Sequence, residues 1–570
     1  MHHPPPPLMR ILVMPLLALS LLLTTLQPVH PDSATPPRTT EIVRIYAPTP
    51  ADSTRLVARG LDLLEARDGA ELFAQVTPAE RAALEADGWQ VRSDPQSATI
   101  LQPPSIAEFN HRATTLAAPD RAIFNNGYRT VEETQAYLHA MAASYPQLTT
   151  LVDYGNSWQA IQSGNTAGYH LLALRITNHA TTGPKPVFFL MAAIHARELV
   201  TAEIATRFIR YLLEGYGKNA SVTWLLNEHE VVVVPLVNPD GRKLAETGLM
   251  QRKNMNTADG PCTVPNQGVD LNRNSSLSWG TVGSSTAPCS ETYRGRSAAS
   301  EPEVAALQQF ITSLFPNRPR PAAGTPAPAT TTGVLITLHA TGDLVLWPWG
   351  YTYDAAPNAT ELARLGTLFA AFNGYNPQQS TYLYPLSGST DDWAYGELGL
   401  AAYTFEIGST SDPLCSGFMP PYSCLDEGTG GRFWARNLPA LLYAAHVARA
   451  PYSQPFGPQI GQITVVTDTH TITITADING RDVLVGAAEI SFDRSPLQGA
   501  TPLQLRPTDG TFDSMREQGQ VVLSNPVTRT LVLVQAQSAT GVWGPIRGVW
   551  IGTAHDPLLV RHIWLPVIKR

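Results

Sequence analysis

VFFLM at residues 187–191, GVLITL at 333–338 and AAYTF at 401–405 are the stretches that decide the fold of this chain. Each is short and apolar, and each is followed at once or within a few positions by polar residues. Such runs are typical of buried strands in an α/β sheet, whose ends present chemical groups at one edge. The polar residues that follow them are His195, Glu198, His339 and Glu406.

The residue types at these strand ends indicate a metal site. His195 and Glu198 are three positions apart in the sequence HARE, which suits a tight loop aimed at one ion. Together with His339 they provide two imidazoles and one carboxylate, a set that binds catalytic zinc and leaves a fourth position for water. Glu406 is a separate carboxylate, and an activated water needs such a group as its proton acceptor.

These residues, in this order, resemble the zinc metallocarboxypeptidases of the carboxypeptidase A/B family. The resemblance covers roughly residues 122–447 and implies a mixed, twisted sheet flanked by helices, of the α/β class. One His-x-x-Glu alone would be weak support, but several ordered motifs match. They are HARE at 195–198, a turn NPDG at 238–241, RK at 252–253, GVDLNRN at 268–274, PCSETY at 288–293 and YPLSGSTDDW at 384–393.

The resemblance assigns the catalytic roles. It implies one Zn²⁺, bound by the two histidines and Glu198, with Glu406 as general base and then general acid to the leaving amine. Arg252 polarises the scissile carbonyl and stabilises the oxyanion. Asp270 is expected to hydrogen-bond the non-ligating nitrogen of His195 and so to fix its tautomer.

The resemblance also implies how the substrate is anchored. Arg273 offers a planar fork that suits a carboxylate, and Asn272 and Tyr384 complete a clamp for the substrate's terminal carboxylate. Arg197 contributes further along the peptide. Since the clamp holds the free C-terminus, the expected activity is that of an exopeptidase acting on peptide or protein C-termini.

Asp391 is the candidate determinant of specificity. It stands just before the family's Asp-Trp pair, here Asp392 and Trp393, and the resemblance implies that it lies at the floor of the side-chain pocket. A buried carboxylate without a partner is costly, so a cationic C-terminal residue is favoured. Leucines at 346, 383 and 386 would line the same pocket, and dual specificity therefore stays open.

Composition limits the architecture and the partners. At 570 residues the chain is too long for one ordinary domain. The net charge is −8 and no Lys/Arg cluster resembles a phosphate track, so we expect no nucleic-acid partner. We expect a monomer.

The N-terminus resembles a secretory signal peptide, assigned to residues 1–30. Arg10 precedes the apolar stretch 11–23, which is too short to span a bilayer comfortably; a buried N-terminal helix is the alternative. No later segment has 18 or more apolar residues, so a secreted protein without a transmembrane segment is expected.

In an exported chain, four cysteines predict two disulfides, with free buried thiols as the alternative. The family resemblance pairs Cys262 with Cys289, and Cys415 would then pair with Cys424.

Two further units flank the catalytic segment. Residues 41–98 read as a small α+β unit, with a strand at 41–46 and a helix opened by the capping box Thr77-Pro78-Ala79-Glu80. Its position resembles that of a propeptide, which would make the protein a zymogen; an accessory domain that stays attached is the alternative. Short alternating strands within 453–555 predict an immunoglobulin-like β-sandwich, acting as spacer, stabiliser or binding module.

Two rival functions remain at this stage. Another zinc hydrolase on the same fold, such as an N-acyl amino-acid deacylase or a cell-wall peptidase, would share the metal-binding core. The set of Arg252, Asn272, Arg273 and Tyr384 favours peptide C-termini instead. An inactive adhesion or binding protein is the second rival, and the presence of all ligands and the base argues against it.

Overall fold

The structure is a computed structural model that describes part of the chain. The expected signal peptide lies, apart from Met1, outside the described residues. The described residues are Met1 and 40–95, 127–316, 324–410, 412, 414–428, 430–524 and 528–552.

A mixed eight-stranded sheet carries the catalytic segment, in the order β11-β10-β12-β9-β7-β8-β6-β5. The three predicted strands are adjacent and parallel at its centre, in the order β12-β9-β7. The expected α/β class with a mixed sheet is therefore confirmed. The strands are β5 (Thr149–Asn156), β6 (His170–Ile176), β7 (Val187–Ala192), β8 (Glu230–Val234), β9 (Val334–His339), β10 (Leu344–Trp347), β11 (Asn376–Gln379) and β12 (Ala401–Glu406).

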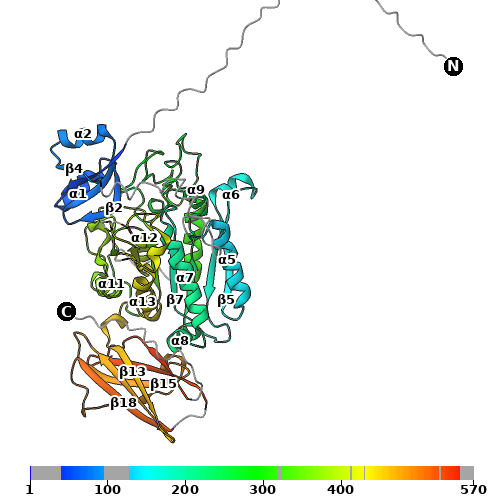
Figure 1. Ribbon diagram of the computed structural model, residues 1–570, viewed down its shortest axis with the longest axis vertical. Helices are drawn as coiled ribbons and strands as arrows, with labels where there is room; N and C mark the ends of the chain where they lie inside the picture. Colours follow the sequence, from blue (N-terminus) through cyan, green and yellow to red (C-terminus); the bar gives the residue numbers. More distant parts are fainter. Residues whose placement is uncertain are drawn as a thin grey trace, which may run out of the picture. The chain divides into compact units, whose positions relative to one another are not determined.

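Helices flank this sheet (Figure 1). Helix α9 begins in the NPDG segment that the sequence indicated as a turn. Asn238 accepts a hydrogen bond from the Gly241 amide, so the turn continues as a helix. The helices are α5 (Val131–Ser144), α6 (Trp158–Ser163), α7 (Leu199–Gly215), α8 (Ala220–Glu228), α9 (Pro239–Ala245), α10 (Pro302–Leu314), α11 (Ala359–Asn373), α12 (Thr390–Leu398) and α13 (Phe433–Val447).

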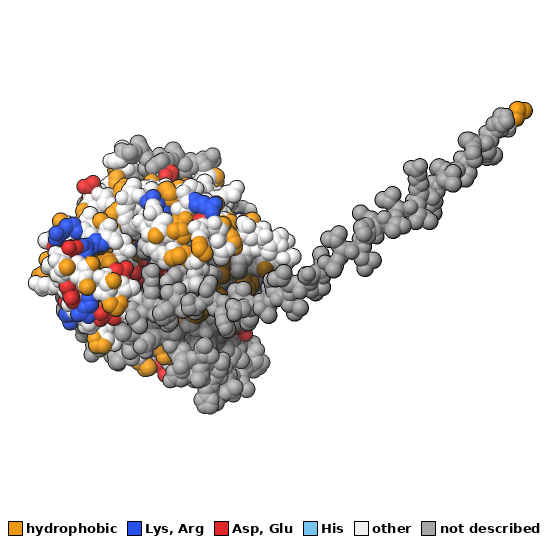
Figure 2. All heavy atoms as spheres, turned by 90° about the horizontal axis from the view of Figure 1, so that it is seen from above, with side chains coloured by type: hydrophobic (Ala, Val, Ile, Leu, Met, Phe, Trp, Pro, Cys, Tyr) orange, Lys and Arg blue, Asp and Glu red, His pale blue; other side chains and the backbone are white. Residues whose placement is uncertain are grey.

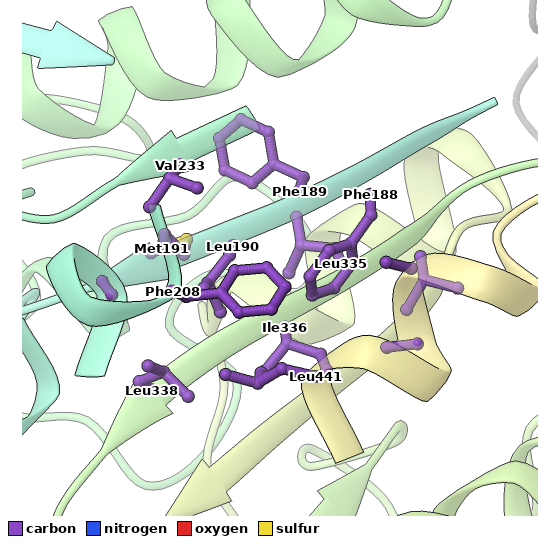
Figure 3. Close-up of a cluster of buried hydrophobic side chains, with 14 of the residues drawn as sticks. Phe188, Phe189, Leu190, Met191, Phe208, Val233, Leu335, Ile336, Leu338 and Leu441 are labelled. Carbon is purple, nitrogen blue, oxygen red and sulfur yellow. The ribbon is translucent and has the colours of Figure 1, made fainter. Parts of the chain in front are cut away.

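The core of this unit is built on β7, all of whose side chains are buried. Phe208 of α7 and Leu441 of α13 approach the side chains of β7 and β9 in Figure 3. A strand that is covered on both faces needs apolar residues at every position, not at alternate ones. This explains why VFFLM is continuously apolar, and it fixes the sheet edge where the polar residues emerge.

The N-terminal unit has the order β-α-β-β-α-β and a four-stranded sheet in the order β2-β3-β1-β4. The capping box of Thr77 and Glu80 is formed as predicted. The sequence analysis did not identify α1 or the hairpin of β2 and β3, whose turn contains Gly69 at φ 57°. The elements are β1 (Glu41–Tyr46), α1 (Pro50–Val57), β2 (Asp62–Asp68), β3 (Glu71–Val76), α2 (Pro78–Ala86) and β4 (Val91–Ser93).

Two four-stranded sheets follow the catalytic segment, in the orders β13-β14-β18-β17 and β16-β15-β19-β20. Leu531 and Leu533 of the second sheet belong to the same apolar core as the catalytic segment. The Glu228 carboxylate accepts two hydrogen bonds of 2.6 Å from the backbone N–H and Oγ of Ser495. The strands are β13 (Gln459–Thr467), β14 (Thr471–Asn479), β15 (Val485–Phe492), β16 (Leu503–Gln504), β17 (Arg506–Pro507), β18 (Arg516–Ser524), β19 (Thr530–Ser538) and β20 (Arg547–Ile551).

Two disulfides are present, Cys262–Cys289 and Cys415–Cys424. Within the described ranges, no helix has the length and apolar character needed to cross a bilayer. On the face shown in Figure 2, basic and acidic side chains lie close to one another.

Candidate active site

Three side chains converge at the edge of the sheet where β7 and β9 end. The ligating atoms of His195, Glu198 and His339 all lie within 4.8 Å of one another, and all three residues are buried. The two Nδ1 atoms are 3.1 Å apart, and His195 Nδ1 is 2.7 Å from Glu198 Oε1. A buried convergence of two imidazoles and one carboxylate fits a zinc ion held by three protein ligands.

Local structure explains this convergence. His339 is the last residue of β9, and Glu198 is the residue on which α7 begins. The Ala340 amide donates a hydrogen bond of 3.2 Å to Glu198 Oε2, which links the two strand ends. Burial opposes ionisation of Glu198, but His195 and His339 lower its pKa below the usual value.

Asp270 lies behind the first of these histidines. Its Oδ1 is 3.2 Å from His195 Nε2, which leaves Nδ1 facing the metal position. Burial acts against ionisation of Asp270, yet Arg252 and Arg273 hold its pKa well below the usual range. A permanently ionised carboxylate at Nε2 fixes the ring and the tautomer that a metal ligand requires.

Glu406 is the last residue of β12 and pairs directly with His339 of β9. Its side chain is buried, and its Oε2 has no hydrogen-bond partner among the described residues. Burial, followed by the charges of Glu65 and Glu198, raises the pKa of Glu406 well above the usual value. A buried carboxylate oxygen without a partner is costly, so the site is arranged for a group that this oxygen can contact.

Arg252 of the catalytic segment contacts both Asp270 and the N-terminal unit. Its Nε donates to Asp270 Oδ2 at 3.0 Å. Its two terminal nitrogens donate to the two oxygens of Glu65 in β2 at 2.8 and 2.6 Å, so the pair is bidentate. Burial opposes ionisation, but Arg252 holds the pKa of Glu65 below its usual range.

Arg273 and Tyr384 lie side by side, with Arg273 Nη2 3.2 Å from the Tyr384 hydroxyl. Arg273 Nε donates to the Gly283 carbonyl at 3.0 Å, which orients the guanidinium. Gly283 has a φ of +63°, and a Cβ there would lie 2.1 Å from the Pro385 carbonyl oxygen, so only glycine fits. Asn272 is adjacent and accepts a hydrogen bond from the Thr390 amide.

Asp391 and Asp392 occupy the first turn of α12, and both are buried. Both oxygens of Asp392 accept from the Gly350 amide, at 2.9 and 3.0 Å. Burial, and then the charge of Asp391, raises the pKa of Asp392 well above the usual value. Asp391 Oδ2 has the Ser380 hydroxyl at 3.3 Å.

Arg197 lies at the far side of the same site. Its Nη1 is 3.1 Å from Glu291 Oε2, and its guanidinium lies 4.2 Å from the centre of the Phe418 ring. Among the described residues, its Nε has no hydrogen-bond partner although the side chain is buried.

Sequence reasoning missed three residues that contact this constellation: Glu65, Gly350 and Ser380. Glu65 stands in a strand that the sequence analysis did not identify, and nothing in the sequence connects it with Arg252. Gly350 and Ser380 become relevant only because the fold places them beside Asp392 and Asp391. No local sequence signal would have indicated any of the three.

Comparisons with known proteins agree with this geometry. The family described as zinc carboxypeptidase matches residues 134–429. A zinc carboxypeptidase of Saccharothrix mutabilis subsp. capreolus is 30% identical, over 69% of this chain and 87% of its own length. Carboxypeptidase B of Bos taurus is 29% identical, over 58% of this chain and 81% of its own.

A solved structure shows the same fold. The crystal structure of carboxypeptidase A from Helicoverpa armigera has a TM-score of 0.56 at 22% identity and covers 71% of this chain and 97% of its own. The family match covers more than half of this chain, and the residues that converge at the sheet edge fit the zinc that the family binds. The chain belongs to the zinc carboxypeptidase family and is a metallocarboxypeptidase.

Proposed function

We propose that this protein is a secreted exopeptidase that removes single residues, preferentially Lys and Arg, from peptide C-termini. The observation that carries the proposal is a pair of anchors suited to the two ends of one terminal residue, its carboxylate and its side chain. Arg273 and Tyr384 supply a fork for the terminal carboxylate, and Asp391 supplies a buried negative charge for the last side chain. Only the terminal residue can satisfy both anchors.

His195, Glu198 and His339 would hold the zinc. When bound, zinc acts as a Lewis acid that polarises the scissile carbonyl and lowers the pKa of water toward about 7. Glu406, with its buried and unpartnered oxygen, accepts the proton of the attacking water and passes it to the leaving amine. Arg252 donates hydrogen bonds to the carbonyl oxygen as negative charge develops there.

Zinc removal tests the proposal. We expect the chain, after proteolytic release of the N-terminal unit, to cleave N-blocked dipeptides ending in Lys or Arg faster than one ending in Phe. A chelator abolishes this activity, and added zinc restores it, because zinc supplies the Lewis acid that activates the water and polarises the carbonyl. Turnover is followed by release of the free amino acid.

Two outcomes would contradict the proposal. A preference for the peptide ending in Phe would support the zinc-dependent mechanism but would contradict the assignment of Asp391 as the specificity determinant. The zinc-loaded protein could instead cleave none of the three peptides but hydrolyse N-acyl amino acids. This result would indicate a deacylase on the same fold.

We infer further that residues 41–98 act as an inhibitory propeptide to the catalytic domain at 122–447. The bidentate pair of Glu65 with Arg252 occupies the donors that catalysis requires. Leucines at 344, 346, 383 and 386 pack against the apolar core of the N-terminal unit, and access to the side-chain pocket is thereby restricted. Arg67 of β2 also donates to the Leu383 carbonyl at 3.3 Å.

Glu65→Gln tests this inhibition. The substitution removes the charge while keeping the shape, and it leaves Arg252 partly unpaired in a buried site, which weakens docking by about 3 kcal/mol. We expect the intact Glu65→Gln chain to be at least about tenfold more active than the intact wild type. Blocked dipeptide hydrolysis before and after limited proteolysis measures this.

Glu85→Gln, on the exposed surface of α2, is the matched control and should leave the intact chain inhibited. After proteolysis, wild type and both variants should have equal activity. An intact wild-type chain that is already as active as the proteolysed one would show that the N-terminal unit is an attached accessory domain.

Secretion and the remaining domain boundaries are also proposals. Two disulfides and no free cysteine among the described residues support an oxidising compartment.

The paired sheets within 453–555 support a β-sandwich, and their immunoglobulin-like topology stays a prediction. Contacts such as Glu228 with Ser495 favour a stabilising role for this unit over that of a tethered binding module.

A further inference from the structure

Ser380 contacts the carboxylate to which the basic specificity was assigned. It is the first residue of the short 3₁₀ helix at Ser380–Tyr382, directly after β11. Its hydroxyl lies 3.3 Å from Asp391 Oδ2, and both side chains are buried. Among the described residues, no other side chain donates a hydrogen bond to Asp391. The second oxygen, Oδ1, is therefore left for a partner from outside the chain.

The Ser380 hydroxyl is held in place by its neighbours. The side-chain amide of Gln379 donates to the carbonyl oxygens of Trp349, Thr352 and Asp354, at 3.1, 2.9 and 3.1 Å. The Thr381 amide donates to the same Trp349 carbonyl at 3.2 Å. With the residues before and after it fixed to one loop, Ser380 cannot withdraw without breaking these bonds. The hydroxyl is therefore fixed in place beside Asp391.

Asp392 does not compete for the substrate's charge. Both of its oxygens accept from the Gly350 amide, and its burial beside Asp391 favours its neutral form. The carboxylate that can contact a cationic side chain in this part of the site is consequently that of Asp391, beside the Ser380 hydroxyl. Discrimination between one cationic side chain and another then depends on the groups that contact Asp391, namely the Ser380 hydroxyl.

We propose that Ser380 is a specificity-determining residue that makes the pocket favour C-terminal lysine over arginine. This inference rests on the proposed basic specificity of Asp391. A lysine ammonium is a compact charge with three donors. It can donate to Asp391 Oδ1 and to a lone pair of Ser380 Oγ while the Ser380 hydroxyl continues to donate its hydrogen bond to Oδ2. An arginine fork binds best when both carboxylate oxygens are free in one plane, and Ser380 already engages one of them.

The test compares kcat/KM for matched N-blocked dipeptides ending in Lys, Arg and Phe, using the full chain after release of its N-terminal unit. Ser380→Ala removes the hydroxyl and should lower the Lys-to-Arg ratio by about tenfold, since one hydrogen bond to a charged group is lost. Ser380→Thr keeps the hydroxyl and should keep the ratio. Ser313→Ala on α10, remote from the pocket in sequence and on another element, is the matched control and should change nothing.

The outcomes separate this inference from the function on which it rests. A wild type that prefers Lys over Arg and loses that preference in Ser380→Ala supports the inference. Basic specificity with an unchanged Lys-to-Arg ratio in Ser380→Ala overturns the inference alone. Preference of the wild type for Phe overturns the assignment of Asp391 and the inference with it. If Ser380→Ala does not fold, Ser380→Cys takes its place, because a thiol is a weak donor of similar size, and the same criterion applies.

Discussion

Glu406→Gln lowers kcat by about 10³-fold, the middle of the range for losing a general acid–base group. Glutamine keeps the size and the hydrogen-bonding shape of the side chain, but it cannot accept the proton of the attacking water. Glu406 lies outside the convergent ligand set and pairs through its backbone with His339. The zinc content should therefore stay at one per chain, and KM should change by less than about threefold.

Steady-state kinetics on a blocked dipeptide, together with metal analysis of the same sample, measures both effects. Glu214→Gln is the control, because Glu214 pairs with Arg210 on the exposed surface of α7 and should leave kcat unchanged. A Glu406→Gln variant that retains more than about a tenth of the wild-type kcat would assign the proton transfer to another group. Loss of zinc together with activity would indicate a structural role.

Asp391→Leu reverses the selectivity of the enzyme. With leucine at this position a lysine or arginine side chain enters the pocket without a counter-ion, which costs about 3–5 kcal/mol. We therefore expect kcat/KM for basic C-terminal residues to fall by about 10²–10³-fold, and that for Phe to rise. Most of the loss should appear before the chemical step, as a raised KM, since Asp391 is proposed to contact the substrate's side chain and not the reacting carbonyl.

Asp391→Asn separates charge from shape in the same assay. It keeps the volume and removes the charge, so it should lose the basic substrates but gain little on Phe. Asp426→Asn, in an exposed pair with Arg207, is the surface control. Equal losses for Lys, Arg and Phe peptides in Asp391→Leu would mean that the residue supports α12 and does not select the substrate.

The sequence determined the central sheet because β7, β9 and β12 are mainly apolar up to their last residues and are buried at every position. A strand buried on both faces has to be apolar throughout, and its polar continuation has to emerge at the sheet edge. The capping box of Thr77 and Glu80 at the start of α2 was likewise visible in the sequence. These signals are local, so they can be read without knowledge of the fold.

Local signals also explain the incomplete assignments. The hairpin of β2 and β3 contains charged residues such as Glu65 and Arg67, whose burial depends on partners far along the chain. A pattern of apolar and polar residues cannot indicate a strand whose polar side chains are covered by another unit. Strand β1 and helix α2 were therefore predicted, whereas β2, the strand that reaches the active site, was not.

By itself, the sequence determined that His195, Glu198, His339 and Glu406 follow or end three apolar strands and that their residue types suit zinc and a base. It could not determine that Arg252 is paired with Glu65, or that Ser380 supports Asp391. These pairs join residues separated by 187 and 11 positions and belong to no shared motif. Only tertiary structure decides such contacts, because a buried charge takes whichever partner the fold brings within hydrogen-bond distance.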